Sequence, residues 1–191
     1  MKLLEERILR DGEVLPGGVL KVGSFLNHQL DVSLYEKMAA EWHRLFADDG
    51  VNKIVTVEAS GIGLACIAAC SFGCCPVVFA KKSKTSNVDA ANLFSAQVHS
   101  FTHGNDYTMV VERRYLSPAD RVLLIDDFLA NGEALRGLAK IVRESGAALV
   151  GAGIAIEKAF QSGGAELRAE GLRIESLARI RSMDDTGITF C

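Results

Sequence analysis

The sequence has few of the features that mark disordered or membrane-spanning chains. Only 3 of its 191 residues are proline, while 49% are hydrophobic, so the composition excludes an intrinsically disordered protein. No apolar run approaches the roughly 20 residues that cross a bilayer. The first twelve residues, MKLLEERILRDG, are charged throughout and do not have the apolar centre of a secretion signal. We therefore expect a cytoplasmic protein with no membrane partner.

The chain also lacks an excess of basic charge and an even number of cysteines. The net charge is -3, which gives no basic footprint for a nucleic-acid partner. The chain has 5 cysteines, and an odd number favours free thiols over a disulfide framework. Cys66, Cys70 and Cys74 recur every four residues, with Cys75 adjacent and no histidine nearby. We expect them to be small buried hydrophobic side chains on one helix face rather than a metal site.

The most informative stretch is RVLLIDDFLANGEAL, residues 121–135. Its apolar residues 122–125 predict a buried strand, and Asp126 and Asp127 follow at the carboxyl end of that strand. The small residues of the turn at 130–134 then open a helix, where free backbone N–H groups can hold a phosphate. The stretch therefore predicts a site for a sugar phosphate.

A second strand, turn and helix of similar design begins at residue 53. The apolar strand 53–57 leads into Glu58-Ala59-Ser60-Gly61, and an Ala- and Cys-rich helix follows. Such a turn can hold an anion, although its glycine spacing is not that of the dinucleotide-binding fingerprint. The next apolar run, residues 76–80, predicts a second buried strand. Together these strands favour an α/β protein, and the length fits a single domain spanning residues 1–191.

The remaining pattern predicts further elements. Apolar spacing indicates a helix over residues 1–10, and Ser33 with Glu36 forms a capping box that predicts a helix from Leu34 to about residue 47. A hairpin is expected from strands at residues 94–101 and 107–111. The chain should end with strand 149–156, helix 165–169, strand 172–180 and a short terminal segment, whereas residues 81–93 read as a polar, basic loop.

The strand, acid pair and small-residue turn resemble the 5-phosphoribosyl 1-diphosphate (PRPP) motif of the type I phosphoribosyltransferases. Three further segments resemble the purine-salvage members that act on xanthine, in the same order and almost end to end: GVLKVGSFLNHQLD, VTVEASGIGLA and IAIEKAFQSGGAELRAEGLRIESLARI. The resemblance implies the type I phosphoribosyltransferase fold, a central mainly parallel sheet flanked by helices, with a small hood built from roughly residues 1–30 and 159–191. It also implies a homodimer.

The resemblance further implies a reaction and a set of site residues. The 5-phosphoribosyl group of PRPP would pass to xanthine, giving xanthosine 5'-monophosphate and pyrophosphate, with Asp126 and Asp127 as the catalytic acids. Xanthine would contact Leu20, Asn27 and Lys158. PRPP would be bound by Glu58, Ala59, Ser60, Gly61, Lys81, Lys82, Ala130, Asn131, Gly132, Glu133 and Ala134. Mg²⁺ would arrive largely on PRPP, because the sequence shows no dedicated cluster of metal ligands. The polar residues 81–93 stand where the family has a mobile loop over the diphosphate.

The residues themselves leave alternatives open. Without the resemblance, Asn27 could serve a turn and Lys158 could be a surface lysine. Relatives that act on hypoxanthine and guanine carry an Asp, assigned to proton removal, where this chain has Ala130, so the general base is not identified. A phosphoribosyltransferase for guanine, hypoxanthine or adenine is one alternative. A non-catalytic PRPP-sensing regulator is another, but it would need a DNA-binding segment or a basic surface that the sequence does not offer.

Overall fold

A computed structural model describes residues 1–83, 90–100, 105–184 and 187–191. The strands are β1 (Glu13–Leu15), β2 (Val19–Lys21), β3 (Lys53–Val57), β4 (Val77–Ser83), β5 (Leu93–Ser100), β6 (Asn105–Glu112), β7 (Arg121–Leu129), β8 (Ala148–Lys158), β9 (Ile174–Asp184) and β10 (Gly187–Phe190). The α-helices are α1 (Lys2–Asp11), α2 (Val32–Leu45), α3 (Ser60–Ser71), α4 (Glu133–Glu144) and α5 (Gly163–Ala169). All of the predicted helices are therefore present, with shifted ends.

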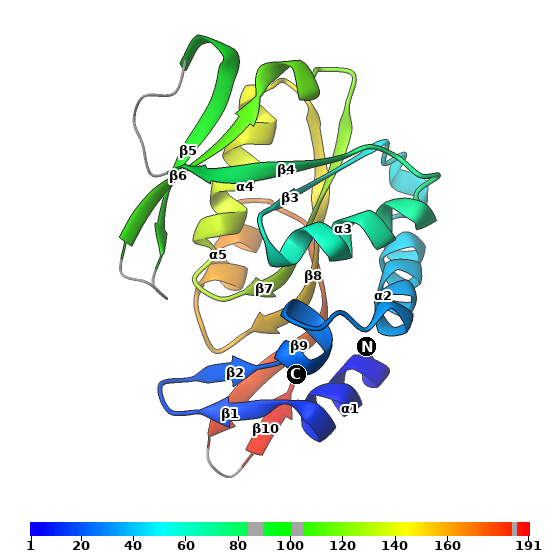
Figure 1. The fold of residues 1–191 in the computed structure, drawn as a ribbon, viewed down its shortest axis with the longest axis vertical. Helices are drawn as coiled ribbons and strands as arrows, with labels where there is room; N and C mark the ends of the chain where they lie inside the picture. The colour runs from blue at the N-terminus through cyan, green and yellow to red at the C-terminus, as the bar shows by residue number, and fades with distance from the viewer. Residues whose placement is uncertain (84–89, 101–104, 185–186) are drawn as a thin grey trace.

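The centre of the molecule is an eight-stranded sheet in the order β10-β9-β8-β7-β3-β4-β6-β5 (Figure 1). The neighbours β9, β8, β7, β3 and β4 run parallel. Antiparallel strands flank them, β10 at one edge and the β5–β6 hairpin at the other. The predicted mainly parallel sheet is confirmed, and β10 is an edge strand that the sequence analysis did not foresee.

Helices cover both faces of the parallel strands, which explains why β7 is apolar on both sides. On one face, α2 and α3 pack over Leu123 and Ile125 in a core that also contains Trp42. On the other face, α4 packs over Leu124 and the β5–β6 hairpin. Alternate residues of β7 therefore belong to different cores, as the two-residue period of a strand requires. None of the helices in the described residues is long and apolar enough to cross a membrane.

Both ends of the chain meet at one end of the sheet (Figure 1). There α1, the two-stranded sheet of β1 and β2, and a single π-helical turn at Gly23–Asn27 lie beside β9 and β10. The amino group of Met1 donates to the carbonyl of Leu177, which ties the first residue to β9. This is the arrangement expected of a hood, although α5 and β9 belong to the layers of the main sheet.

The start of α2 differs from its prediction. The helix begins at Val32, and the side chain of Asp31 accepts the N–H of Leu34 at 3.1 Å. Asp31 also accepts a hydrogen bond from Arg7 of α1, at 2.6 Å. The Ser33 capping box is therefore wrong: Asp31 caps the helix because it can satisfy the helix start and bind α1 at the same time.

Two predictions of burial are also wrong. In β4, which was predicted to be buried, the side chain of Ala80 is buried but that of Phe79 is 39% exposed. Cys66, Cys70 and Cys74 are exposed and Cys75 is half-buried. The buried side of α3 is formed instead by its glycine, leucine and alanine residues. Because α3 is apolar all round, its sequence does not indicate which side faces the sheet.

Residues 81–93 are more regular than predicted. Lys81–Ser83 continue β4 and pair with β6, and residues 90–92 form a short 3-10 turn before β5. Lys84 and the rest of the predicted loop at 84–89 lie outside the described residues, as does the hairpin turn that contains His103.

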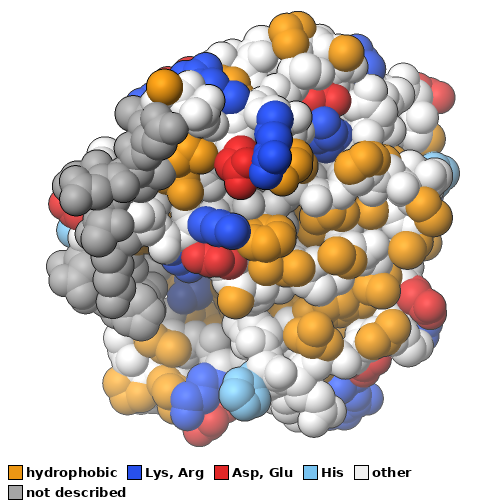
Figure 2. All heavy atoms as spheres, turned by 45° about the horizontal axis from the view of Figure 1, so that its top comes forward, with side chains coloured by type: hydrophobic (Ala, Val, Ile, Leu, Met, Phe, Trp, Pro, Cys, Tyr) orange, Lys and Arg blue, Asp and Glu red, His pale blue; other side chains and the backbone are white. Residues whose placement is uncertain are grey.

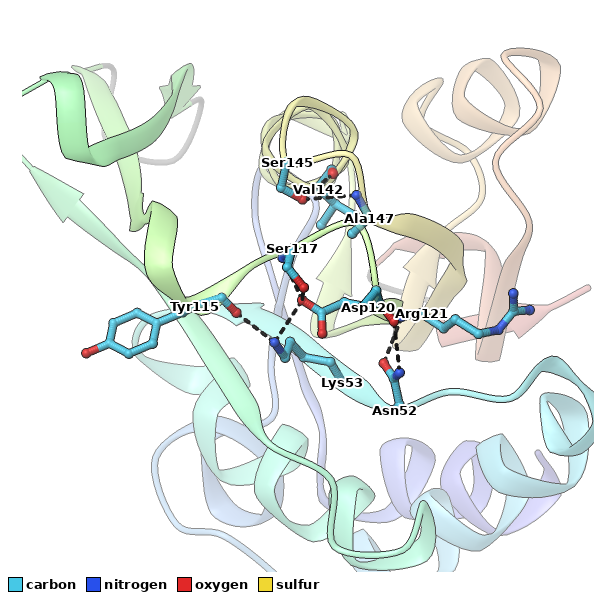
Figure 3. Close-up of polar contacts among 10 residues, drawn as sticks. Asn52, Lys53, Tyr115, Ser117, Asp120, Arg121, Val142, Ser145 and Ala147 are labelled. Atoms are coloured by element: carbon cyan, nitrogen blue, oxygen red, sulfur yellow. Dashed lines mark hydrogen bonds and ion pairs between the residues drawn. The ribbon is translucent and has the colours of Figure 1, made fainter.

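A polar network fixes the amino ends of β3 and β7 (Figure 3). Lys53 Nζ lies 2.8 Å from Asp120 Oδ2 and donates to the carbonyl of Tyr115 at 2.8 Å. Asp120 Oδ2 also accepts the N–H of Ser117 at 2.7 Å. Burial raises the pKa of Asp120, but these bonds together lower it by more. The pKa of Asp120 therefore lies below its ordinary value. The network anchors the sheet at the end opposite Asp126 and Asp127, so the carboxyl ends are left for function.

Candidate active site

The acid pair lies at the carboxyl end of β7, as predicted, and both side chains are buried. Asp126 is 5% exposed and Asp127 is 8% exposed. Because neighbouring residues of a strand point to opposite faces, the two carboxylates lie in different surroundings. The N–H of Asp127 donates to Asp126 Oδ1 at 3.0 Å, which links them through the backbone.

Asp126 lies among groups from β4 and β6. Burial, and next the charge of Asp127, raise the pKa of Asp126 well above its ordinary value, while the ammonium of Lys82 acts in the opposite direction. The Lys82 ammonium also lies 5.4 Å from the centre of the Tyr107 ring. Burial and the charges of Asp126 and Glu133 raise the pKa of Tyr107. Tyr107 is a site residue that the sequence analysis missed, because only the pairing of β6 with β4 brings it here.

Asp127 faces the hood. Its Oδ2 accepts a hydrogen bond from Asn27 Nδ2 at 3.2 Å, so the structure brings these two predicted residues together. The hydroxyl of Tyr35, on α2, donates to the carbonyl of Leu26 and so holds the backbone next to Asn27. Burial and the charge of Asp127 raise the pKa of Tyr35 to about 12. The second acid is thereby joined to the N-terminal segment.

The phosphate loop, residues 130–134, runs from the end of β7 into the first turn of α4. Gly132 has φ +83, a left-handed conformation that favours glycine, and α4 starts at the next residue. The N–H groups of a first helical turn have no partner inside the helix, so this loop can bind a phosphate. Gly163 of α5 packs directly on its backbone. The loop therefore leads into a helix start, as the sequence predicts, and α5 packs on its backbone.

The second turn is partly helical. Ser60 and Gly61 are already in α3, so only Glu58 and Ala59 belong to the turn itself. Glu58 Oε1 accepts the N–H of Lys82 at 2.6 Å, which joins the turn to β4. A Cβ on Gly61 would lie 2.1 Å from Thr56 Oγ1 and 3.3 Å from Asp126 Oδ1, so only glycine fits there. Lys81 is exposed on the other side of β4 and lines a different surface.

The other two predicted base contacts, Lys158 and Leu20, also lie at the hood. Lys158 is half-buried at the end of β8, where its Nζ donates to the carbonyl of Gly18 at 2.9 Å and lies 5.8 Å from the centre of the Phe128 ring. Burial lowers the pKa of Lys158. Leu20 is 6% exposed and packs in the hydrophobic core next to the position of Gly12. Phe128, directly after the acid pair, was not singled out from the sequence.

Another surface feature lies away from this site. Figure 2 shows hydrophobic side chains gathering on one face between scattered charged ones. A groove of about 370 Å³ is lined by Val77, Val78, Phe79, Lys81, Leu93, Val110, Val111, Glu112 and Tyr115. Neither acid of the pair lines it, and Lys81 is the one predicted PRPP-binding residue among its lining residues. Within the described residues no group of three or more His, Cys, Asp or Glu side chains could hold a metal ion.

Comparison with known proteins defines the class of protein to which the chain belongs. Residues 21–166 match the family model for the phosphoribosyl transferase domain. The chain is 53% identical to a xanthine phosphoribosyltransferase of Bifidobacterium adolescentis, over 96% of this chain and 95% of the relative. It is 52% identical to one of Ruminiclostridium cellulolyticum, over 100% and 99% of the two chains. The chain belongs to the xanthine phosphoribosyltransferase family.

Solved structures support the fold. APRTase of Giardia lamblia complexed with 9-deazaadenine superposes with a TM-score of 0.77 at 21% identity, covering 92% of this chain and 97% of that chain. Adenine phosphoribosyltransferase of Rhodothermus marinus gives 0.74 at 18% identity, covering 94% and 99%. The predicted type I phosphoribosyltransferase fold is confirmed.

Proposed function

We propose that this protein transfers the 5-phosphoribosyl group from PRPP to xanthine in purine salvage, giving xanthosine 5'-monophosphate and pyrophosphate. The observation that carries the proposal is the buried pair Asp126 and Asp127, which precedes the phosphate loop in the chain and contacts Asn27 of the hood. Full-length relatives named for this activity support it.

The acid pair suits the ribose. As pyrophosphate leaves C1, positive charge develops on the ribose ring, and fixed carboxylates stabilise such charge more effectively in a buried site than in water. Asp126 and Asp127 also offer oxygens that accept bonds from the ribose hydroxyls. Their surroundings differ, so Asp126 would act on the diphosphate side, near Lys82, and Asp127 on the base side, near Asn27.

The phosphates of PRPP would occupy two places. The 5-phosphate would lie on the phosphate loop, against the N–H groups at the start of α4. The diphosphate would lie by Ala59 and Gly61, where Lys82 supplies positive charge. Asp126 and Asp127 fit Mg²⁺, because they are buried oxygen donors whose mutual repulsion a cation would relieve. Bound Mg²⁺ would neutralise charge on the leaving diphosphate, with most of its oxygen ligands coming from the substrate.

Lys158 would recognise the base. Its half-buried ammonium is held at the hood by Gly18, next to the face of Phe128, where a planar ring could stack. An ammonium there favours an acidic oxopurine, because it stabilises the anion that xanthine forms when it loses a ring proton. This would reduce the need for a general base, and the side chain of Ala130 cannot provide one.

The test is pyrophosphate release from PRPP and Mg²⁺ with xanthine, guanine, hypoxanthine and adenine offered separately. Xanthine should give the highest kcat/KM. Preference for adenine would refute the assignment of the base. Absence of release with all four bases, together with measurable PRPP binding, would favour a PRPP-sensing regulator.

We further propose that the protein acts as a homodimer in the cytoplasm, without a nucleic-acid partner. The support for a dimer is exposed apolar surface: α3 has no charged residue, its Cys66 and Cys70 are exposed, and Phe79 and Tyr115 are also exposed. Five cysteines without disulfides fit a reducing compartment. Sedimentation equilibrium would give the mass in solution, and a monomer at micromolar concentration would refute the dimer.

A further inference from the structure

A polar cluster around one buried carboxylate lies next to Lys158 in the chain, and the proposed reaction leaves it without a role. Its centre is Glu157 on β8, the residue before Lys158, which is 1% exposed. Arg168 of α5 donates to both carboxylate oxygens of Glu157, each at 2.7 Å. From β9, Ser176 donates to Oε2 and Arg179 Nε lies 3.2 Å from it. We call these four residues the Glu157 cluster.

The Glu157 cluster joins three elements in one fixed geometry. Burial raises the pKa of Glu157, but the hydrogen bonds from Arg168 and Ser176 outweigh it, so the net pKa lies below the ordinary value and the carboxylate stays ionised. Arg168 also donates to the carbonyl of Ile174 at 3.2 Å, at the start of β9. A bidentate hydrogen bond between a guanidinium and a carboxylate fixes orientation as well as distance. The orientation of α5 relative to β8 is therefore set by Arg168.

Two consecutive glycines of α5 touch opposite parts of the site. A Cβ on Gly164 would lie 2.4 Å from Glu157 Oε1, so this glycine packs on the cluster. A Cβ on Gly163 would lie 2.3 to 2.5 Å from backbone atoms of residues 130–132, so this glycine packs on the phosphate loop. The start of α5 is thus wedged between the residue that precedes Lys158 and the loop proposed to hold the 5-phosphate.

We propose that Arg168 is a positioning residue which, through Glu157 and α5, fixes Lys158 and the phosphate loop relative to each other. The inference rests on the proposed function, since Lys158 meets the base and the loop meets the ribose phosphate. Transfer requires the purine nitrogen and C1 of PRPP to meet in line, and an error of about 1 Å can cost about 100-fold in rate. Arg168 controls that distance without touching either substrate.

The first test compares Arg168→Met with a matched control, Arg173→Met. Arg173 also bridges two carboxylates, with its Nη1 2.8 Å from Asp49 and its Nε 3.0 Å from Glu175, but it lies at the start of β9, at the opposite end from Lys158. In Arg168→Met, Lys158 and the phosphate loop would move away from their substrates as well as from each other. The KM values of xanthine and PRPP should therefore rise on the order of tenfold, less than the cost of a full 1 Å displacement. Arg173→Met should lower Tm and leave both KM values within twofold of wild type.

A second variant separates positioning from stability. Arg168→Met alone leaves a buried carboxylate with fewer partners and can fail to fold, whereas replacing both partners of such a pair is usually tolerated. The double variant Glu157→Met/Arg168→Met should recover Tm but keep both KM values raised, because α5 is no longer oriented. Arg168→Lys should give KM values between those of wild type and Arg168→Met, since one ammonium cannot reproduce the bidentate hydrogen bond.

The outcomes are distinct. Wild-type KM values in the folded double variant would overturn the positioning role and leave the cluster purely structural. A wild-type protein that releases no pyrophosphate with any purine base would instead refute the proposed function.

Discussion

Replacing Gly163 with alanine should impair PRPP use more than it impairs folding. The added Cβ would lie 2.3 Å from the carbonyl carbon of Asn131, 2.4 Å from the carbonyl oxygen of Ala130 and 2.5 Å from the nitrogen of Gly132. All three are backbone atoms, so no side chain can rotate away. Ordinary contact begins at 3.4 Å, so the start of α5 and the phosphate loop must separate by about 1 Å.

The size of that displacement determines both the expected loss of stability and the expected loss of activity. Overpacking of this kind costs about 1–3 kcal/mol of unfolding free energy. A 1 Å error in the place of a reacting group costs about 100-fold in rate, equivalent to about 2.7 kcal/mol of transition-state stabilisation. We therefore expect Gly163→Ala to lower kcat/KM for PRPP by about 100-fold while the protein stays folded at 25 °C.

The control is a glycine far from the site that is also crowded, although less tightly. A Cβ on Gly151, near the beginning of β8, would lie 2.9 Å from both the carbonyl oxygen of Arg173 and Cε1 of Phe46. Gly151→Ala should lower Tm without changing kcat/KM by more than about twofold, since the displacement lies outside the site. Initial rates of pyrophosphate release over a range of PRPP concentrations, with thermal melts of the same samples, give both quantities. Equal loss of kcat/KM in the two variants, or full activity in Gly163→Ala, would refute the role of α5 in shaping the loop.

Three further results are expected. Because burial and Asp127 raise the pKa of Asp126, the folded state holds a proton that the unfolded state releases near pH 3.9; the contribution of Asp126 to stability should therefore fall as pH rises above that value. Asp126→Asn should flatten this dependence and raise Tm at pH 7 while abolishing turnover, and a lower Tm at pH 7 in melts from pH 4 to 8 would contradict it. Lys158→Met should raise the KM of xanthine about tenfold or more and that of PRPP much less, because it removes a half-buried charged donor; equal increases in initial-rate assays would indicate a structural role. Asn27→Ala should raise the KM of xanthine more than Asp127→Asn does, because Asn27 is assigned to the base and Asp127 to the ribose. The reverse order would leave Asn27 only as the donor of one hydrogen bond, at 3.2 Å, to Asp127.

The sequence predicts the parts of the fold in which local pattern and tertiary packing agree. β7 is apolar at every position from 122 to 125 because both faces are covered, and the acids that follow it lie where a parallel sheet places function. Other features depend on contacts that no local pattern contains. Asp31 and Ser33 are both good helix caps, and the nearby Arg7 of α1 makes Asp31 the better one.

Site residues were missed for the same reason. Tyr107 looks like an ordinary alternating residue of a hairpin, and it reaches the acid pair only because β6 lies next to β4. Gly163 looks like a helix start, and its contact with the phosphate loop appears only when α5 folds back onto α4. The roles of Asn27 and Lys158 at the base are expected only from the resemblance to the family, because their residue types alone leave those roles ambiguous.

Asp126 and Asp127 follow one another in the chain, and this adjacency determines the faces to which their side chains point. A strand turns successive side chains to opposite faces, so a single strand end presents one carboxylate to the β4–β6 side and the other to the hood. In the proposed reaction, the ribose of PRPP would be held between these two surroundings, with the diphosphate on the Lys82 side and the base on the Asn27 side. Moving either acid away from the other by one position would place both on one face, so in the proposed reaction the order of residues in β7 would separate the leaving group from the nucleophile.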